Sequence, residues 1–450
     1  MKSIRIGSGA GYSGDRLEPA LDLIEKGNLD YIIFECLAER TIAIAQQEKM
    51  KNPKRGYDSL LEYRMRKILP LMAKKSVKVI SNMGAANPIS AVEAIVDIAK
   101  ELKVSNIKIA AVFGDEITEI IDNYSDYEVL ETGKLLSELE GDIISANVYM
   151  GADGIVEALK NGANIIITGR VSDPALTLGP LMYEFDWKAD DFDKIGKGIS
   201  LGHLLECAGQ VTGGYFADPG KKDVKNLANL GFPYADITQD GVFTITKLEN
   251  SGGEVSLRTC KEQIIYEIHD PAKYLTPDAT ADFSNISMKE IKKDLVEITG
   301  ATSYGKSETL KVSIGYKDCY TGEGEITYGG ESSYGRAKLA GEIVVERLKI
   351  ANVEIEELKV DLIGVNSLFM DKISKNINGN CIHNEVCLRI CGRTKTKSEA
   401  IKIGNEVETL YTNGPFGGGG ATKVAKEIIS VCSIFIPRKD VKALVEYKEI

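Results

Sequence analysis

The sequence has few histidines, no C-x-x-C cysteine pair and no long apolar run. Only three of the 450 residues are histidine, which argues against a metal site built from several histidines, although carboxylates would still suit Mg²⁺. The eight cysteines without C-x-x-C spacing favour reduced thiols over a disulfide framework. No stretch approaches the roughly 18 apolar residues of a membrane span, and the sequence starts without a secretory apolar region. We therefore expect a cytoplasmic protein that does not contact membranes.

Two further kinds of site are disfavoured. The 55 basic residues are outnumbered by 66 acidic ones, giving a net charge of −11, whereas a nucleic-acid surface needs clustered Lys and Arg. Cys381, His383, Cys387 and Cys391 lie close together, but the alternation over 385–390 predicts a strand and the spacing matches no standard zinc pattern. We predict no nucleic-acid partner and no metal-binding residues.

Six short apolar runs in the first 175 residues are each followed by glycine, charged or amide residues. The runs lie at 4–6, 31–34, 77–80, 107–113, 143–144 and 165–167. Their alternation with helical or polar segments predicts βαβ units on a parallel sheet. Because single cores stop growing near about 250 to 300 residues, two domains are expected.

The pattern changes at about residue 210, where glycines and turns increase. Beyond it we expect strands over 242–246, 263–268 and 310–314 and a helical stretch around 287–296, followed by further helices and strands. The predicted fold is therefore α/β: residues 1–210 form a parallel-sheet ligand-binding domain with a cleft at the strand ends, and residues 211–450 form a mixed α+β domain containing a Gly-rich loop at 413–423.

Polar residues follow the predicted strands, and the carboxyl ends of parallel strands meet at one edge of a sheet. We expect these residues to bind a small polar anion, with Arg16, Arg40 and Arg170 as anion clamps. The candidate binding residues are Gly9, Gly11, Ser13, Gly14, Asp15 and Arg16 after the first run, Arg40 after the second, Asn82 and Asn87 after the third, Asp115 after the fourth, Asn147 after the fifth, and Arg170 and Asp173 after the sixth.

Two glycine clusters are candidates for anion binding. Residues 9–14 fit G-x-G-x-x-G and Glu35 follows at the end of the second run, which is the outline of a dinucleotide fingerprint. Asp15 would repel a pyrophosphate there, so an approach of backbone amides to a carboxylate or phosphate is favoured. The second cluster lies in the loop at 413–423. This loop is either a nest of backbone N–H groups for an anion, such as a phosphate of CoA or a nucleotide, or a flexible surface flap. Its glycines are Gly417, Gly418, Gly419 and Gly420.

The candidate catalytic residues are Glu35, Glu39, His203 and Glu206. His203 and Glu206 are three residues apart and share one face if they begin a helix, so they would suit acid–base chemistry. The alternative is that His203 is a helix cap or a packed polar residue. Ser13 and Cys36 lie outside any G-x-S-x-G elbow, which disfavours covalent catalysis.

Several long strings resemble the acyclic terpene utilisation AtuA family over nearly the whole chain. They include Phe-Glu-Cys-Leu-Ala-Glu-Arg-Thr (34–41), Ser-Asn-Met-Gly-Ala-Ala-Asn-Pro (81–88) and Thr-Gly-Arg-Val-Ser-Asp-Pro-Ala-Leu (168–176), with further matches at 11–20, 202–220 and 269–278. The resemblance implies a link to bacterial degradation of citronellol- and geraniol-type compounds through acyl-CoA intermediates. It supplies no catalytic residues. Many members end in a ferredoxin-fold domain that this sequence lacks at its end, which implies a separately encoded small partner.

Three alternative functions are therefore considered, the first being the leading hypothesis. The first is an enzyme of carboxylic-acid or acyl-CoA catabolism that performs hydratase, dehydratase or C–C lyase chemistry on a small carboxylate or a CoA thioester, with no cofactor assigned and Mg²⁺ as an option. The second is a non-catalytic or partner-dependent subunit that needs the small ferredoxin-fold protein. The third is an NAD(P)-dependent oxidoreductase. We also expect a homo-oligomer, as is common for enzymes of this size.

Overall fold

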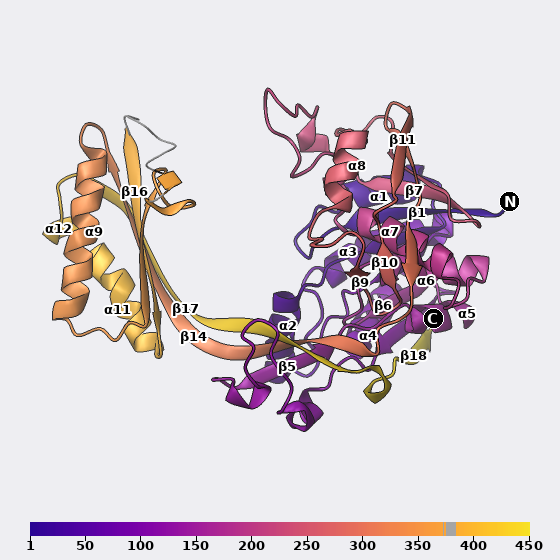
Figure 1. The fold of residues 1–450 in the computed structure, drawn as a ribbon, viewed down its shortest axis with the longest axis horizontal. Coiled ribbons are helices and arrows are strands. Elements are labelled where there is room, and N and C mark those ends of the chain that lie inside the picture. The colour runs from indigo at the N-terminus through magenta and orange to yellow at the C-terminus, as the bar shows by residue number, and fades with distance from the viewer. Residues whose placement is uncertain (372, 375–383) are drawn as a thin grey trace. The chain divides into compact units, whose positions relative to one another are not determined.

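The computed structural model describes residues 1–371, 373, 374 and 384–450 (Figure 1). The chain divides into two compact units. Unit 1 comprises residues 1–139, 143–315 and 431–450, and unit 2 comprises residues 140–142 and 316–430. The change of pattern near residue 210 falls inside unit 1, because the strands that follow it extend the same sheet as the first strand.

Unit 1 is built on a ten-stranded sheet with the order β11-β12-β8-β7-β1-β2-β3-β6-β4-β18. The pairs from β1 to β4 are parallel, and the strands added at either side are antiparallel. The α/β fold class is thus confirmed. The strands are β1 (Ser3–Ala10), β2 (Tyr31–Phe34), β3 (Lys78–Ser81), β4 (Lys108–Phe113), β6 (Ile165–Thr168), β7 (Pro233–Thr238), β8 (Phe243–Lys247), β11 (Ser287–Lys292), β12 (Leu295–Thr299) and β18 (Leu444–Glu449).

Five of the six predicted apolar runs form the parallel part of this sheet. β2 and β6 are buried at every residue, as expected for strands covered on both faces. The run at 143–144 differs: β5 (Ile143–Val148) pairs with β14 (Thr309–Gly329) instead. Only short 3-10 helices lie between β4 and β5, so the chain there lacks the helical crossover that joins parallel neighbours. A small sheet of β9 (Tyr274–Leu275), β10 (Thr280–Asp282) and β13 (Thr302–Tyr304) completes the strands that lie wholly in unit 1.

The helices of unit 1 cover the parallel strands. Apolar residues of α1, α3 and α4 form one core cluster with side chains of β2, β3 and β6. Helix α5 contacts β4 and β6, α6 contacts β2, and α7 contacts β1. Among the described residues, no helix combines the length and apolar character needed to cross a membrane. The helices are α1 (Glu18–Lys26), α2 (Glu39–Lys51), α3 (Leu61–Lys75), α4 (Pro88–Glu101), α5 (Asp153–Lys160), α6 (Ala175–Phe185), α7 (Phe192–Glu206) and α8 (Leu257–Ile264).

Two local predictions in the segment after residue 210 are wrong. The expected strand at 263–268 is instead the end of α8 and the turn after it. This helix begins after Ser256, whose side chain accepts the N–H of Thr259 and caps the first turn. The expected helix around 287–296 is the β11–β12 hairpin, whose turn holds Asp294 at a φ of 58°. The strands expected at 242–246 and 310–314 correspond to β8 and to part of β14.

Among the described residues, the four strands and two longer helices of unit 2 follow the order β-α-β-β-α-β, with the short helix α12 after the second of these helices. Its strands lie in the order β15-β16-β14-β17, and both β14 and β15 pair antiparallel with β16. This is the order of a ferredoxin-like split βαβ motif, so a unit of that topology lies within the chain itself. Helices α9 and α11 pack on the sheet through a common apolar cluster. The elements are β14, α9 (Ser333–Ile350), β15 (Glu357–Ile363), β16 (Glu385–Thr394), α11 (Lys397–Glu408), α12 (Leu410–Asn413) and β17 (Gly418–Pro437).

Candidate active site

A cavity of about 1020 Å³ lies in unit 1 where the parallel strands β1, β2 and β6 end. Further walls come from the end of α7 and from segments near residues 209–215, 266–277 and 307–311. The described lining residues include six carboxyl groups and three lysine or arginine side chains. These are Asp15, Glu35, Glu39, Asp173, Glu206 and Glu267, with Arg16, Arg170 and Lys311. The cavity thus lies beside residues that follow several of the parallel strands.

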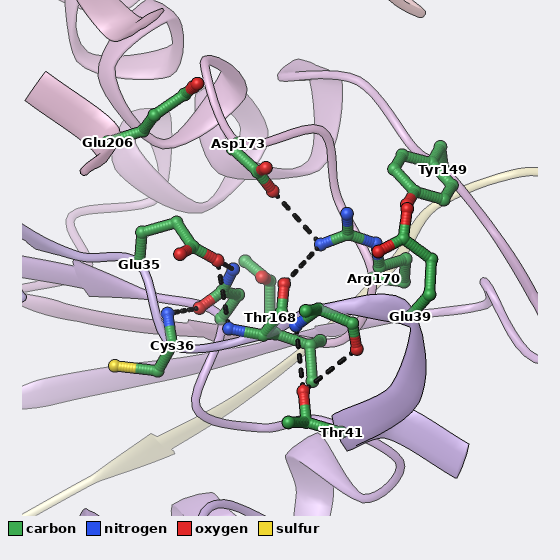
Figure 2. Close-up of polar contacts among 12 residues, drawn as sticks. Glu35, Cys36, Glu39, Thr41, Tyr149, Thr168, Arg170, Asp173 and Glu206 are labelled. Atoms are coloured by element: carbon green, nitrogen blue, oxygen red, sulfur yellow. Dashed lines mark hydrogen bonds and ion pairs between the residues drawn. The ribbon is translucent and has the colours of Figure 1, made fainter. Parts of the chain in front are cut away.

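Glu35 lies directly after β2 and is buried. Its Oε1 accepts hydrogen bonds from the N–H of Leu37 and from Nδ2 of Asn82, each at 2.9 Å, while Asn82 Oδ1 accepts the N–H of Cys36 at 2.7 Å. Burial, together with the nearby charge of Asp173, raises the pKa of Glu35 well above its usual value. Asn82 thus positions Glu35 without lining the cavity, and Figure 2 shows the sulfur of Cys36 directed away from Arg170.

Arg170 lies at the centre of the polar group in Figure 2, between Asp173 and Glu39. Its Nη1 donates to the carbonyl oxygen of Leu37 at 2.7 Å and to Oδ1 of Asp173 at 3.0 Å. The guanidinium carbon lies 3.9 Å from the ring centre of Tyr149, in cation–π geometry. The arginine is therefore held by groups of the protein itself.

Glu39 is the first residue of α2, and its carboxylate interacts with the positive charges of Arg170 and Lys311. It accepts hydrogen bonds from the Tyr149 hydroxyl and from Lys311 Nζ, the latter at 3.3 Å. Burial would raise the pKa of Glu39, but the charge of Arg170 and the Tyr149 hydrogen bond outweigh it and lower the pKa to about 2. An ionised, paired carboxylate of this kind suits positioning rather than proton transfer.

His203 and Glu206 form a buried pair in the last turn of α7. His203 Nδ1 lies 2.7 Å from Glu206 Oε1. Burial lowers the pKa of His203 to about 4 and raises the pKa of Glu206 well above its usual value. Burial thus favours the uncharged forms of both groups, in which the Glu206 carboxyl donates to Nδ1 and Nε2 carries the imidazole proton.

Several polar atoms of the cavity lining are buried without a hydrogen-bond partner. Buried polar groups are almost always paired in folded proteins, so such a group of atoms marks a place that a polar ligand would complete. The atoms are Arg170 Nε, Ser172 Oγ, His203 Nε2, Glu206 Oε2 and Gln210 Oε1.

Asp115 does not line the cavity but binds the backbone of Arg170, which does. Its Oδ2 accepts the Arg170 N–H at 3.0 Å and Asn147 Nδ2 at 2.8 Å. A Cβ on Gly169 would lie 2.3 Å from Oδ1 of Asp115, so only glycine allows this approach. Burial raises the pKa of Asp115 to about 6.

Replacing Asp115 by asparagine should therefore change how stability depends on pH. A carboxyl whose folded pKa exceeds its unfolded value of 3.8 binds more protons in the folded state, so its contribution is lost as the pH rises from about 4 to about 6. Relative to wild type, Asp115→Asn should gain about 2 kcal/mol of unfolding free energy between pH 4 and pH 7, since one pKa unit is about 1.4 kcal/mol and part of the titration lies below pH 4. Urea unfolding at both pH values measures this change, and parallel curves would contradict it.

The loop after β1 closes on its own carboxylate. Asp15 Oδ2 accepts the N–H of Gly11 at 2.9 Å, and Ser13 Oγ donates to Asp58 Oδ2 at 2.5 Å. Helix α1 starts only at Glu18, three residues beyond Asp15. Of the G-x-G-x-x-G residues, Gly9 lies within β1 and packs on Phe34. The N–H of Gly11, which we expected to face an anion, is instead bound by the carboxylate of Asp15.

A buried ion pair holds this loop in place. Arg64 Nη1 lies 3.6 Å from Asp58 Oδ1, with 1% and 4% of the two side chains exposed. Arg64 Nη2 also donates to the carbonyl oxygens of Ser13 and Asp15, at 2.7 and 3.2 Å. Arg16, which is exposed, donates to the carbonyl oxygens of Leu227 and Ala228.

Ten of the 21 predicted site residues line the cavity, and the other eleven do not. Asn87 caps α4 and bonds to two carbonyl oxygens, and Gly417–Gly420 belong to unit 2, where the last three begin β17. Cys381 and His383 lie outside the described residues. The predicted residues that do not line the cavity are Gly9, Gly14, Arg40, Asn82, Asn87, Asp115, Asn147, Gly417, Gly418, Gly419 and Gly420.

Four important lining residues were not among the predicted site residues. Tyr149 follows β5, so its position after a strand was a usable signal. Lys311 is reached only through the pairing of β5 with β14, where the Tyr149 N–H donates to the Lys311 carbonyl oxygen at 2.9 Å. Tyr274 packs on His203 with ring centres 5.3 Å apart, and Glu267 has a φ of 60°. Neither position has a sequence signal.

One comparison with known proteins gives a match. A family model described as acyclic terpene utilisation family protein AtuA matches residues 4–447. No curated protein and no solved structure matches the chain.

Proposed function

Because the chain belongs to the acyclic terpene utilisation AtuA family and has a polar cavity, we propose that it is an enzyme. The proposed enzyme performs acid–base chemistry on a carboxylate or an acyl-CoA thioester. The reaction class is a hydratase, dehydratase or C–C lyase. The family description suggests a role in acyclic terpene catabolism. The observation that carries the proposal is the buried His203–Glu206 pair, whose outer atoms Nε2 and Oε2 have no partner and belong to lining residues of the cavity.

The pair can deliver a proton to a substrate oxygen. In its uncharged form, His203 Nε2–H donates to the oxygen of a leaving hydroxyl group or a developing enolate. The Glu206 proton then moves to Nδ1, which restores a neutral imidazole and leaves a carboxylate at Glu206. General acid catalysis of this kind contributes about 10²–10⁴-fold to a rate.

Glu35 is suited to the opposite step. Because burial raises its pKa, a Glu35 carboxylate is a stronger base than an exposed one and can remove a proton from carbon next to a carbonyl group. Arg170, fixed by Asp173 and Asp115, offers Nε as a hydrogen-bond donor to the oxygen on which charge develops.

Hydrogen exchange tests this chemistry without knowledge of the final product. Wild-type protein is incubated in D₂O with a panel of carboxylates and acyl-CoA thioesters, and each compound is followed by mass spectrometry. We expect deuterium incorporation or addition of water in at least one compound, and Glu35→Gln should reduce the rate by about 10²–10⁴-fold. Glu25→Gln on α1, which lies outside the cavity lining, is the matched control.

A panel in which compounds bind but none exchanges or reacts would contradict the proposal. Binding is measured separately by the rise in the thermal midpoint, because a ligand that binds only the folded state stabilises it.

A further inference from the structure

We infer that Ser13 is the nucleophile of a second, covalent activity in this cavity, in which its hydroxyl oxygen takes the acyl group of an ester or thioester. The inference goes beyond the proposed function, because it uses neither the His203–Glu206 pair nor Glu35. It begins from a contact in the loop after β1, where Ser13 Oγ donates to Asp58 Oδ2 at 2.5 Å. Ser13 lines the cavity, whereas Asp58 does not.

Asp58 is placed to act as the general base. A serine hydroxyl is a weak nucleophile until a group within hydrogen-bond reach takes its proton, and that group must itself be held in place. The other oxygen of Asp58 is held, since Oδ1 accepts the N–H of Leu60 at 2.8 Å and lies 3.6 Å from Arg64 Nη1. Burial raises the pKa of Asp58, which makes its carboxylate a stronger base towards Ser13.

Ser13 is also part of a turn whose backbone donors are free. The Asp15 N–H donates to the Tyr12 carbonyl oxygen at 3.1 Å, so Ser13 and Gly14 are the central residues of the turn. Within the described part of the chain, the N–H groups of these two residues have no acceptor. In enzymes with a nucleophile elbow, the N–H of the residue after the nucleophile stabilises the oxyanion. Gly14 has that place in this sequence.

No local sequence pattern reveals the Ser13–Asp58 pair. The two residues are 45 positions apart, and no G-x-S-x-G elbow surrounds the serine. The sequence therefore disfavours covalent catalysis, while the fold supplies the base that the motif lacks.

Two acyl-transfer steps follow from this arrangement. Ser13 Oγ forms a bond to the acyl carbon as its proton passes to Asp58 Oδ2, and the bond from that carbon to the sulfur or oxygen of the leaving group breaks. The leaving group departs with the electron pair and takes the proton from Asp58. Water then attacks the acyl carbon and gives a proton to Asp58, the bond to Oγ breaks, and Oγ recovers that proton. The products are a carboxylic acid and a thiol or alcohol, with water as the only co-reactant.

The wall beside the turn suits an apolar acyl chain. Arg16 follows shortly after Ser13 and donates to the Leu227 carbonyl oxygen at 3.2 Å, so the segment around Leu227 lies next to the turn. Leu227, Leu230 and Phe232 line the cavity. Small-molecule pockets are mostly apolar with a few placed polar groups. We therefore expect an ester or thioester whose acyl chain is apolar.

Covalent labelling of the wild-type protein tests the inference. The full chain is incubated with a fluorophosphonate, which phosphonylates activated serines, and the adduct is located by tandem mass spectrometry. We expect an adduct on Ser13, and Ser13→Ala should lose it. Ser105→Ala, at an exposed serine outside the cavity lining, should be labelled like the wild type. The absence of an adduct, or adducts that map only to other residues, overturns the inference.

A double variant and a solvent comparison test the role of Asp58. Asp58→Asn with Arg64→Met removes the carboxylate without leaving a buried charge unpaired, and its labelling rate should fall by about 10²–10⁴-fold. Labelling of this variant at the wild-type rate overturns the inference. In the wild-type protein, labelling should be slower in D₂O than in H₂O, because the serine proton moves during the attack. Equal rates in the two solvents overturn the inference whether or not the double variant folds.

Ser13 labelling and hydrogen exchange report on different groups, so the two proposals fail separately. A Ser13 adduct without exchange of any compound in D₂O would remove the proposed acid–base chemistry and keep the covalent activity. Exchange without a Ser13 adduct would do the reverse.

Discussion

Replacing His203 by glutamine is expected to lower the exchange rate in D₂O by about 10²–10⁴-fold, the usual contribution of a positioned acid or base. The glutamine removes the imidazole that links Glu206 to the substrate, while its amide still fills part of the space beside Tyr274 and Phe283. Thioester affinity should fall far less than the rate, because binding uses several donors.

His269→Gln is the control for this substitution. His269 is exposed and is the other histidine within the described part of the chain. Its replacement should leave both the rate and the thermal midpoint unchanged. If His203→Gln exchanged at the wild-type rate with its fold intact by circular dichroism, the His203–Glu206 pair would have no catalytic role.

The largest expected change in stability follows from replacing Arg64 by methionine. This substitution leaves the Asp58 carboxylate buried without its cation and removes the donors to two carbonyl oxygens of the loop after β1. Breaking one side of a buried ion pair costs about 3–5 kcal/mol. We expect a loss of that size in the free energy of unfolding, measured with urea, together with weaker ligand binding at the cavity.

Two further variants separate charge from packing at this position. Arg66→Met on the same helix removes an exposed pair with Glu101 and should leave the free energy of unfolding nearly unchanged. The double variant Arg64→Met with Asp58→Asn should recover part of the loss, because no buried charge then remains unpaired. A double variant less stable than Arg64→Met alone would show that the ion pair is not the cause.

The parallel part of the sheet was predictable because its strands are short apolar runs with polar ends. β2 and β6 are buried on both faces, so every residue is apolar except the last of β6. The strand-end rule then places Glu35 and Arg170 at one cavity although they are far apart in the chain. His203 and Glu206 were found by a different signal, their spacing of three residues, which places both on one face of a helix. The family match over residues 4–447 confirms the resemblance seen in the motifs.

What could not be predicted depends on partners that are distant in sequence. Glu39 and Lys311 are 272 residues apart and meet only because β5 leaves the parallel sheet to pair with β14. Arg170 has the residue type of an anion clamp, yet its hydrogen bonds go to Leu37 and Asp173. No sequence pattern shows which donors of a buried arginine the protein has already used.

The route of the chain into and out of unit 2 bears on how this family can diversify. The polypeptide leaves unit 1 after residue 315 within β14 and returns at residue 431 within β17, and these two strands are neighbours in one sheet. A segment whose two ends are adjacent can be exchanged, shortened or duplicated as a cassette with little disturbance to the host domain. Because all described lining residues of the cavity belong to unit 1, sequence changes confined to residues 316–430 would leave the lining of the cavity as it is.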